Sequence, residues 1–232
     1  SCSILVAKFK IKFIKNPMKK ILKGKKILIT AGPVWVPIDK VRVITNVFSG
    51  RLGWTIVKLA HKMGAEITLL MGPGKIDLIS KKIPNLKIIY FRYFDELLKL
   101  AKKEVASKKY DIMIHSAAVN DYAPIISREK KIKSGKQKLI IRLKPTIKIV
   151  DLVKKLDPSI FLIKFKLEVD VSKKKLIDIS YKSMLKSKAD LMVANNMETV
   201  AEYKSHEAFI IDPQKNIKKV IGKEKIASSL LK

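Results

Sequence analysis

The segment between residues 32 and 53 carries residue types that suit anion binding. It is unusually long for a connection between a strand and a helix, and it closes on Ser49-Gly50-Arg51-Leu52-Gly53, where a helical pattern begins. Free backbone N–H groups at a helix start bind phosphate. Arg42 can form paired hydrogen bonds with a phosphate or a carboxylate, and the Asn46 amide can both donate and accept. A surface salt bridge and a simple turn are the alternative interpretations of these two side chains.

A second polar segment, residues 127–137, contains Gly135 and a cluster of charges around Lys131. Its composition predicts a loop too polar to pack, and we expect it to be mobile in the free protein and ordered by a ligand. In a chain this rich in lysine, a solvated charge is the alternative interpretation of Lys131.

Apolar runs alternate with amphipathic stretches along the chain. The expected strands are Lys26–Ala31, Ala65–Leu70, Leu86–Phe91, Asp111–His115, Lys138–Leu143, Ile160–Phe165, Leu191–Ala194 and Ala208–Ile211. The expected helices are Gly50–Met63 with Ser49 as N-cap, Phe94–Ser107, Ile147–Leu156, Ser172–Ser187 and Lys223–Leu231. This order predicts an α/β fold, a Rossmann-like three-layer sandwich with a mostly parallel central sheet. Ligands of such sheets lie outside the carboxyl ends of the strands, here residues 32–50, 117–122, 165–168 and 195.

Length and charge limit the classes of function. The 232 residues suit one domain, residues 21–232, after a basic lead-in or linker, residues 1–20. Fifty Lys and Arg against 20 Asp and Glu give a net charge of +30, which attracts anions. The lysines are spread over the whole length without an aromatic strip, so specific nucleic-acid binding is not expected, although a basic RNA-binding protein remains an alternative. No apolar run approaches the roughly 20 residues of a membrane span, so no membrane association is expected.

Cysteine and histidine usage excludes several chemistries. A lone Cys2 cannot form an internal disulfide and disfavours a thiol mechanism, so the cytoplasm is the expected compartment. His61, His115 and His206 lie far apart and are interpreted as a helix, a strand and a surface residue, and metal ligands remain unknown. The three-glycine dinucleotide fingerprint is absent after the first strand. An NAD(P) oxidoreductase therefore stays only as an alternative.

Several motifs together resemble the phosphopantothenate–cysteine ligase family. The opening Ile29-Thr30-Ala31-Gly32-Pro33 is followed, with the gaps of that family, by Pro37-Ile38-Asp39, Val41-Arg42, Thr45-Asn46 and the Ser49 to Gly53 motif. Later matches are Ala117–Tyr122, Lys131–Lys133, Lys144–Ile147, Phe165–Glu168 and Ala189–Asn195. The departures from the family are Trp35-Val36, Val47-Phe48, Ser134 and Lys164, the last where glycine is usual. These departures concern the substrate contacts of the first loop more than the nucleotide site.

The resemblance implies an activity and its participants. The family joins the carboxylate of phosphopantothenate to the amino group of cysteine through an acyl-nucleotide intermediate, in coenzyme A biosynthesis. It implies CTP, with ATP as the alternative, together with Mg²⁺ and a homodimer. Members are often fused behind a flavin-dependent decarboxylase, and residues 1–20 would then be the linker.

The resemblance also implies roles for individual residues. Asn46 would hold the acyl carbonyl and a phosphate oxygen of the intermediate, Lys131 would reach over the triphosphate, and Arg42 would contact a phosphate or carboxylate. The implied nucleotide-binding residues are Ser49, Gly50, Gly53, Ala117, Ala118, Asp121, Lys131, Lys144, Pro145, Thr146, Ile147, Phe165, Lys182 and Lys186.

Overall fold

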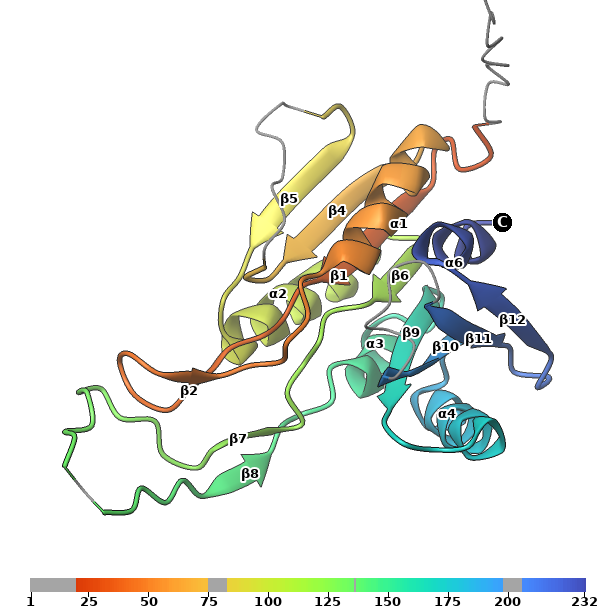
Figure 1. Ribbon diagram of the computed structural model, residues 1–232. Helices are drawn as coiled ribbons and strands as arrows, with labels where there is room; N and C mark the ends of the chain where they lie inside the picture. Colours follow the sequence, from red (N-terminus) through yellow and green to blue (C-terminus); the bar gives the residue numbers. More distant parts are fainter. Residues whose placement is uncertain (1–19, 75–82, 136, 198–205) are drawn as a thin grey trace, which may run out of the picture.

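An eight-stranded sheet forms the centre of the protein (Figure 1). The computed structural model describes residues 20–74, 83–135, 137–197 and 206–232, so Cys2 and most of the predicted lead-in lie outside the described residues. The strand order is β12-β11-β10-β9-β6-β1-β4-β5. The strands are β1 (Lys26–Ala31), β4 (Glu66–Met71), β5 (Leu86–Tyr90), β6 (Ile112–His115), β9 (Phe161–Glu168), β10 (Leu191–Asn196), β11 (Glu207–Ile211) and β12 (Ile217–Ile221). All neighbouring pairs from β5 to β10 are parallel, whereas β11 and β12 form an antiparallel edge.

Helices cover both faces of this sheet and make the three layers. Helices α1 (Arg51–Lys62) and α6 (Lys223–Leu230) bury Ile56 and Ile226 against the face that carries Ile27, Ile29 and Val193. Helices α2 (Phe94–Ala106), α3 (Val150–Leu156) and α4 (Lys173–Ser187) cover the other face, where Leu28, Met113 and Leu162 are fully buried. The predicted Rossmann-like sandwich is confirmed. Within the described segments, no helix combines the length and apolar character needed to cross a bilayer.

Three predictions about individual elements are wrong. Residues 138–142 form no strand, because this segment belongs to an arm outside the main sheet in which β8 (Leu143–Pro145) pairs with β7 (Tyr122–Pro124). Helix α3 begins at Val150 rather than Ile147, because Thr146 is still hydrogen-bonded to Asn120 and Asp121 at the start of that arm. Ser49 is not an N-cap, since Gly50 takes that position with no side-chain hydrogen bond to the helix. The sequence patterns also missed β12 and a short hairpin of β2 (Val36–Pro37) and β3 (Val43–Ile44).

The topology places two loops side by side at the middle of the sheet. Strand β1 lies between β4 and β6, and the chain leaves β1 toward β4 before it returns through β6 on the other side. At such a reversal the loops at the carboxyl ends diverge and leave room for a ligand. Figure 1 shows the β2 segment and the β7–β8 arm projecting together beyond this edge. The candidate residues of the first loop and of Ala117–Tyr122 therefore share one edge.

Candidate functional site

The start of α1 presses directly on the end of β1. Gly50 has a left-handed backbone (φ 81°), and a Cβ there would lie 2.8 Å from the Gly32 nitrogen. A Cβ on Gly53 would lie only 2.5 Å from the Cβ of Ala31. The first helical bond runs from the Trp54 amide to the Gly50 carbonyl (3.1 Å), and no side chain caps the amides before it. An uncapped helix start of this kind provides N–H groups and a partial positive charge for a phosphate.

Asn46 joins the loop after β1 to the loop after β6. Its Nδ2 donates to the Ala118 carbonyl oxygen at 2.9 Å, and the Val34 amide donates to the same oxygen at 3.2 Å. The Ala118 amide returns a bond to the Gly32 carbonyl at 2.9 Å. The amide of Asn46 thus reaches across to a different loop instead of closing a turn on its own backbone. The structure brings together Asn46, the helix start and Ala117-Ala118, three separate predictions.

A buried pair of polar side chains, Thr30 and His115, supports the backbone beside the Asn46–Ala118 contact. The Thr30 hydroxyl lies 3.0 Å from Nδ1 of His115 and accepts a bond from the Ala117 amide at 3.3 Å. Burial lowers the pKa of His115 to about 4, and the nearby Lys164 charge acts in the same direction. The imidazole is therefore neutral at pH 7, and it supports the backbone of Ala117 through the Thr30 hydroxyl that lies between them.

Arg42 lies in a network that sequence reasoning did not anticipate. Its Nη1 donates to the Asp39 carboxylate and to the Ile132 carbonyl oxygen, the latter at 3.3 Å. Asp39 also accepts from backbone amides, and these bonds, led by that of Ile132, hold its pKa well below the usual range. The Pro37-Ile38-Asp39 motif was visible in the sequence, but no role was assigned to its carboxylate. Ile132 is only 8% exposed, so the prediction that residues 127–137 are too polar to pack is wrong at this position, while Lys136 lies outside the described residues.

The β7–β8 arm carries a further group of predicted residues. Asp121 forms an exposed ion pair with Lys148 (2.9 Å), and its carbonyl oxygen accepts from the Thr146 amide (2.9 Å). The Thr146 hydroxyl donates to the Asn120 carbonyl at 2.6 Å. Lys144, Pro145 and Ile147 are exposed beside them. The structure therefore brings residues 144–147 to Asp121 at the base of the arm, and Asp121 follows Ala118 by three residues.

Two predicted lysines lie away from this edge. Helix α4 starts after the carboxyl end of β9 and ends before the amino end of β10, so its second half points toward the opposite edge of the sheet. Lys182 and Lys186 are exposed on that half and are not brought to the other candidates. Phe165 is half-buried near the end of β9, on the face covered by α1 and α6.

Lys164 and His206 are both buried. Lys164 donates to the Ser183 carbonyl, the Ser183 hydroxyl and the Ser187 hydroxyl at 3.0–3.1 Å, and burial lowers its pKa to about 8. This lysine replaces the glycine usual in the family with a side chain that joins β9 to α4. His206 was expected at the surface, but it is 2% exposed, with Nε2 at 2.8 Å from Oδ1 of Asn195.

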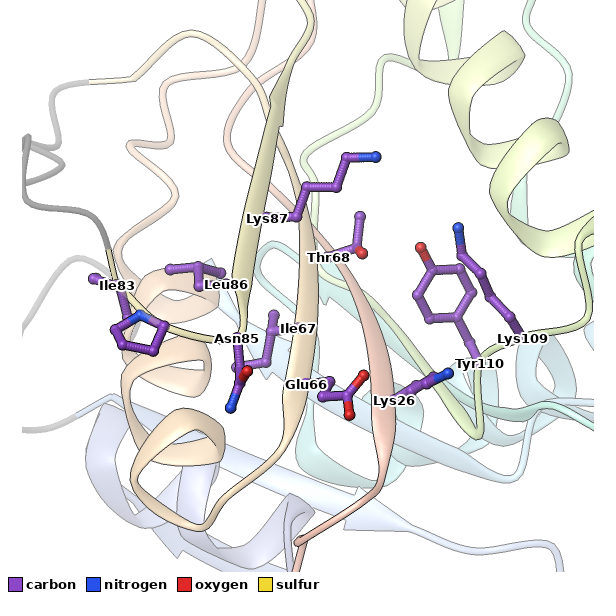
Figure 2. A pocket seen from close by; sticks show the side chains of 11 residues that line it. Lys26, Glu66, Ile67, Thr68, Ile83, Asn85, Leu86, Lys87, Lys109 and Tyr110 are labelled. Atoms are coloured by element: carbon purple, nitrogen blue, oxygen red, sulfur yellow. The ribbon is translucent and has the colours of Figure 1, made fainter.

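A pocket of about 640 Å³ lies at the other end of the sheet (Figure 2). It opens at the amino ends of β1, β4 and β5, and Figure 2 shows Lys26, Lys87, Lys109 and Tyr110 around it. Lys109 is already paired with the Glu104 carboxylate at 2.7 Å. None of the predicted site residues lines this pocket, and ligands of parallel sheets bind at the opposite edge, so we place the candidate site at the carboxyl ends of β1 and β6.

Comparison with known proteins gives the family. Residues 22–232 match the family described as DNA/pantothenate metabolism flavoprotein C-terminal domain. The chain belongs to this family. A coenzyme A biosynthesis bifunctional protein CoaBC of Thermococcus kodakarensis is 37% identical over 179 residues, which cover 77% of this chain and 43% of that protein. Its counterpart of Borreliella burgdorferi is 31% identical over 232 residues, covering 96% of this chain and 56% of that protein.

A solved member of the same family has the same fold. The DNA/pantothenate metabolism flavoprotein from Streptococcus pneumoniae superposes with a TM-score of 0.81 at 33% identity, covering 89% of this chain and 96% of that one. The family membership predicted from the motifs is confirmed. The chain spans about half the length of the bifunctional relatives that it matches. The comparisons support neither an NAD(P) oxidoreductase nor an RNA-binding protein.

Proposed function

We propose that this domain joins phosphopantothenate to cysteine through an acyl nucleotide. The contact that carries the proposal is the hydrogen bond from Asn46 to Ala118, because it fixes a donor amide on a residue that is bonded to Gly32, and Gly32 packs against Gly50 at the uncapped start of α1. The names of the bifunctional relatives agree with a step of coenzyme A biosynthesis. A helix start with uncapped N–H groups near a positioned amide suits the charge and geometry of an acyl-nucleotide intermediate.

The reaction has two displacements, and both concentrate negative charge. In the first, a carboxylate oxygen of phosphopantothenate attacks the α-phosphorus of the nucleotide and pyrophosphate leaves. In the second, the amine of cysteine attacks the acyl carbon, loses a proton, and the nucleoside monophosphate leaves. Positioned N–H groups and cations stabilise such charge more in the transition state than in the ground state. We assign this role to the first-turn amides of α1, to Arg42 and to Lys131.

Asn46 is proposed to hold the intermediate between these displacements. One N–H of its Nδ2 is used by the Ala118 carbonyl, which fixes the orientation of the amide. The second N–H remains to donate to an acyl or phosphate oxygen, since a primary amide carries two donors. An uncharged donor suits this place, because a carboxylate would repel the phosphates.

The nucleotide is proposed to be CTP rather than ATP, and to bring Mg²⁺ with it. Among the described residues there is no group of three or more histidine, cysteine or acidic side chains that could hold a metal ion. Protein sites of this type often bind Mg²⁺ mainly through substrate phosphates, where the ion neutralises charge on the phosphate oxygens. Ser49, Gly50, Gly53, Ala117, Ala118, Asp121, residues 144–147 and Phe165 are proposed to contact the nucleotide. Lys182 and Lys186 lie on the half of α4 that runs toward the opposite edge of the sheet, so this proposal does not include them.

A homodimer is proposed to form through the arm. Apolar side chains of the arm are exposed although the arm lies beside the candidate site: Tyr122 56%, Ile126 75%, Ile140 81% and Leu143 44%. Burial of such side chains against a second copy is favourable, and each contributes on the order of 1–2 kcal/mol. The cytoplasm, where nucleoside triphosphates and cysteine are available, is the proposed compartment.

Pyrophosphate release tests this function. The protein is incubated with Mg²⁺, phosphopantothenate and either CTP or ATP, and then cysteine is added. We expect release that requires phosphopantothenate, is faster with CTP, and is followed by an amide product detectable by mass spectrometry. Reduction of NADP in place of pyrophosphate release would contradict the proposal.

A further inference from the structure

The Asp39 carboxylate is the acceptor of four hydrogen bonds. Oδ1 accepts from the amides of Val41 and Arg42, both at 2.8 Å, and Oδ2 accepts from the Ile132 amide at 3.0 Å and from the Arg42 guanidinium. The side chain of Asp39 is 0% exposed. Buried carboxylates are retained where their charge is fully paired with donors.

These bonds connect two segments that are distant in the sequence. Ile132 lies 93 residues from Asp39, and its carbonyl oxygen accepts from Arg42 while its amide donates to Asp39. The Arg128 amide adds a bond to the Ile38 carbonyl at 3.1 Å. The loop that carries Lys131 is therefore bonded to the loop that carries Arg42 through both the amide and the carbonyl of Ile132, and again through the Arg128 amide.

The fastening point lies directly beside Lys131. Ile132 is 8% exposed, whereas its neighbours Lys131 and Lys133 are exposed on either side of it. A backbone held at Ile132 fixes the origin of the Lys131 side chain and leaves its ammonium group free to reach a ligand. Displacement of a reacting or stabilising group by about 1 Å can cost on the order of 100-fold in rate.

We propose that Asp39 is a positioning residue that sets Lys131 over the site through the Ile132 backbone. This inference rests on the proposed function, in which Lys131 stabilises charge on the triphosphate. An ionised carboxylate is required at this place because every group around it donates. Asparagine at position 39 would turn an N–H toward donors and leave at least one of them unpaired.

Two measurements on the full chain test the inference. The first is hydrogen exchange of the Ile132 amide followed by NMR, which needs no substrate. Asp39→Asn should accelerate this exchange by about 10-fold or more, as expected for loss of a bond to a charged acceptor. The second is pyrophosphate release in Asp39→Asn, Lys131→Ala and the double variant. Asp39→Asn should lower kcat/KM by about 100-fold alone and by only a few-fold when Lys131 is already alanine.

A matched control separates positioning from general stability. Asp111 accepts from the Lys26 amide at 2.8 Å and from Lys25 at 3.0 Å, at the edge opposite the site. Asp111→Asn should change the melting temperature without changing kcat/KM. Should Asp39→Asn fold poorly, Ile132→Pro removes the same N–H from the other side and should reproduce the rate loss with Asp39 in place.

The outcomes distinguish this inference from the proposed function. A wild-type protein that releases no pyrophosphate contradicts the proposed function. Equal exchange of the Ile132 amide in wild type and Asp39→Asn, or rate losses of Asp39→Asn and Lys131→Ala that multiply in the double variant, contradict the positioning role. An Ile132→Pro protein with wild-type activity contradicts it as well.

Discussion

Replacement of Asn46 separates the catalytic role of this residue from a purely structural one. Asn46→Ala removes the donor that reaches the Ala118 carbonyl at 2.9 Å, but that carbonyl keeps the bond from the Val34 amide at 3.2 Å. Asn46→Asp keeps the size of the side chain and turns a carboxylate oxygen toward the same carbonyl oxygen, beside the proposed phosphates. Both variants leave the glycine packing at the start of α1 unchanged.

The expected loss of stability is small compared with the expected loss of rate. A part-buried neutral hydrogen bond contributes about 0.5–1.5 kcal/mol, so Asn46→Ala should lower the free energy of unfolding by about 1 kcal/mol. A domain with a stability of about 5–15 kcal/mol stays folded after such a loss. Removal of a preorganised donor to the intermediate should instead lower the rate by about 100-fold to 1000-fold. Unfolding therefore cannot produce the predicted loss of activity.

Single-turnover kinetics beside thermal unfolding provides the assay. For Asn46→Ala we expect CTP to bind, amide formation with cysteine to slow sharply, and acyl nucleotide to accumulate in phosphorus NMR or mass spectra. Asn46→Asp should be impaired further, because its charge repels the phosphates. A destabilised Asn46→Ala protein with wild-type rates per folded molecule would refute the reasoning and leave Asn46 as a structural residue.

Three more predictions follow from the geometry. Lys131→Ala should slow formation of the acyl nucleotide, because it removes about 2–4 kcal/mol of transition-state stabilisation, whereas Lys130→Ala should have little effect. Equal losses in the rate of pyrophosphate release for the two variants would contradict the assignment of Lys131. Gly53→Ala puts a Cβ 2.5 Å from that of Ala31, so it should lower the free energy of unfolding by about 1–3 kcal/mol and weaken nucleotide binding. An unchanged melting temperature and an unchanged nucleotide affinity would contradict the packing argument. Burial lowers the pKa of Lys164 to about 8, so between pH 8 and about 10.5 the unfolded state binds more protons than the folded state. Over that range the free energy of unfolding of wild type should therefore rise with pH by up to about 3 kcal/mol relative to Lys164→Met, as measured by denaturant unfolding. A difference between the two proteins that does not change with pH would contradict burial of the charge.

The central sheet was predictable because most of its strands are short runs of mainly apolar residues. Residues 27–31 are all buried and only Thr30 among them is polar, as expected of a strand covered on both faces, and the amphipathic helix α1 follows after the first loop. Residues 138–142 were assigned to a strand wrongly because the apolar side chains of Leu139 and Ile140 suit an exposed arm as well as a buried strand, and periodicity alone does not tell the two apart. Strand β12 was missed because only Val220 of its five residues is buried, which gives no alternating pattern.

The candidate site was predictable where a local sequence motif implies a specific backbone arrangement. Glycines at a helix start imply close packing, so Gly50 and Gly53 could be placed from sequence. The contacts of Asp39 with Ile132 and of Asn46 with Ala118 join positions 93 and 72 residues apart, and no local pattern encodes such pairings. Lys182 and Lys186 were assigned by family register alone, which does not specify the end of α4 on which they lie.

The most direct test is the coupling of pyrophosphate release to amide formation. The full chain, supplied with phosphopantothenate, cysteine, Mg²⁺ and CTP, should release one pyrophosphate for each phosphopantothenoylcysteine formed, with no release when phosphopantothenate is left out. Omission of cysteine should leave a single turnover of pyrophosphate with the acyl nucleotide bound. A folded protein that releases no pyrophosphate with CTP or ATP, or that forms the amide without consuming a nucleotide, would contradict the account.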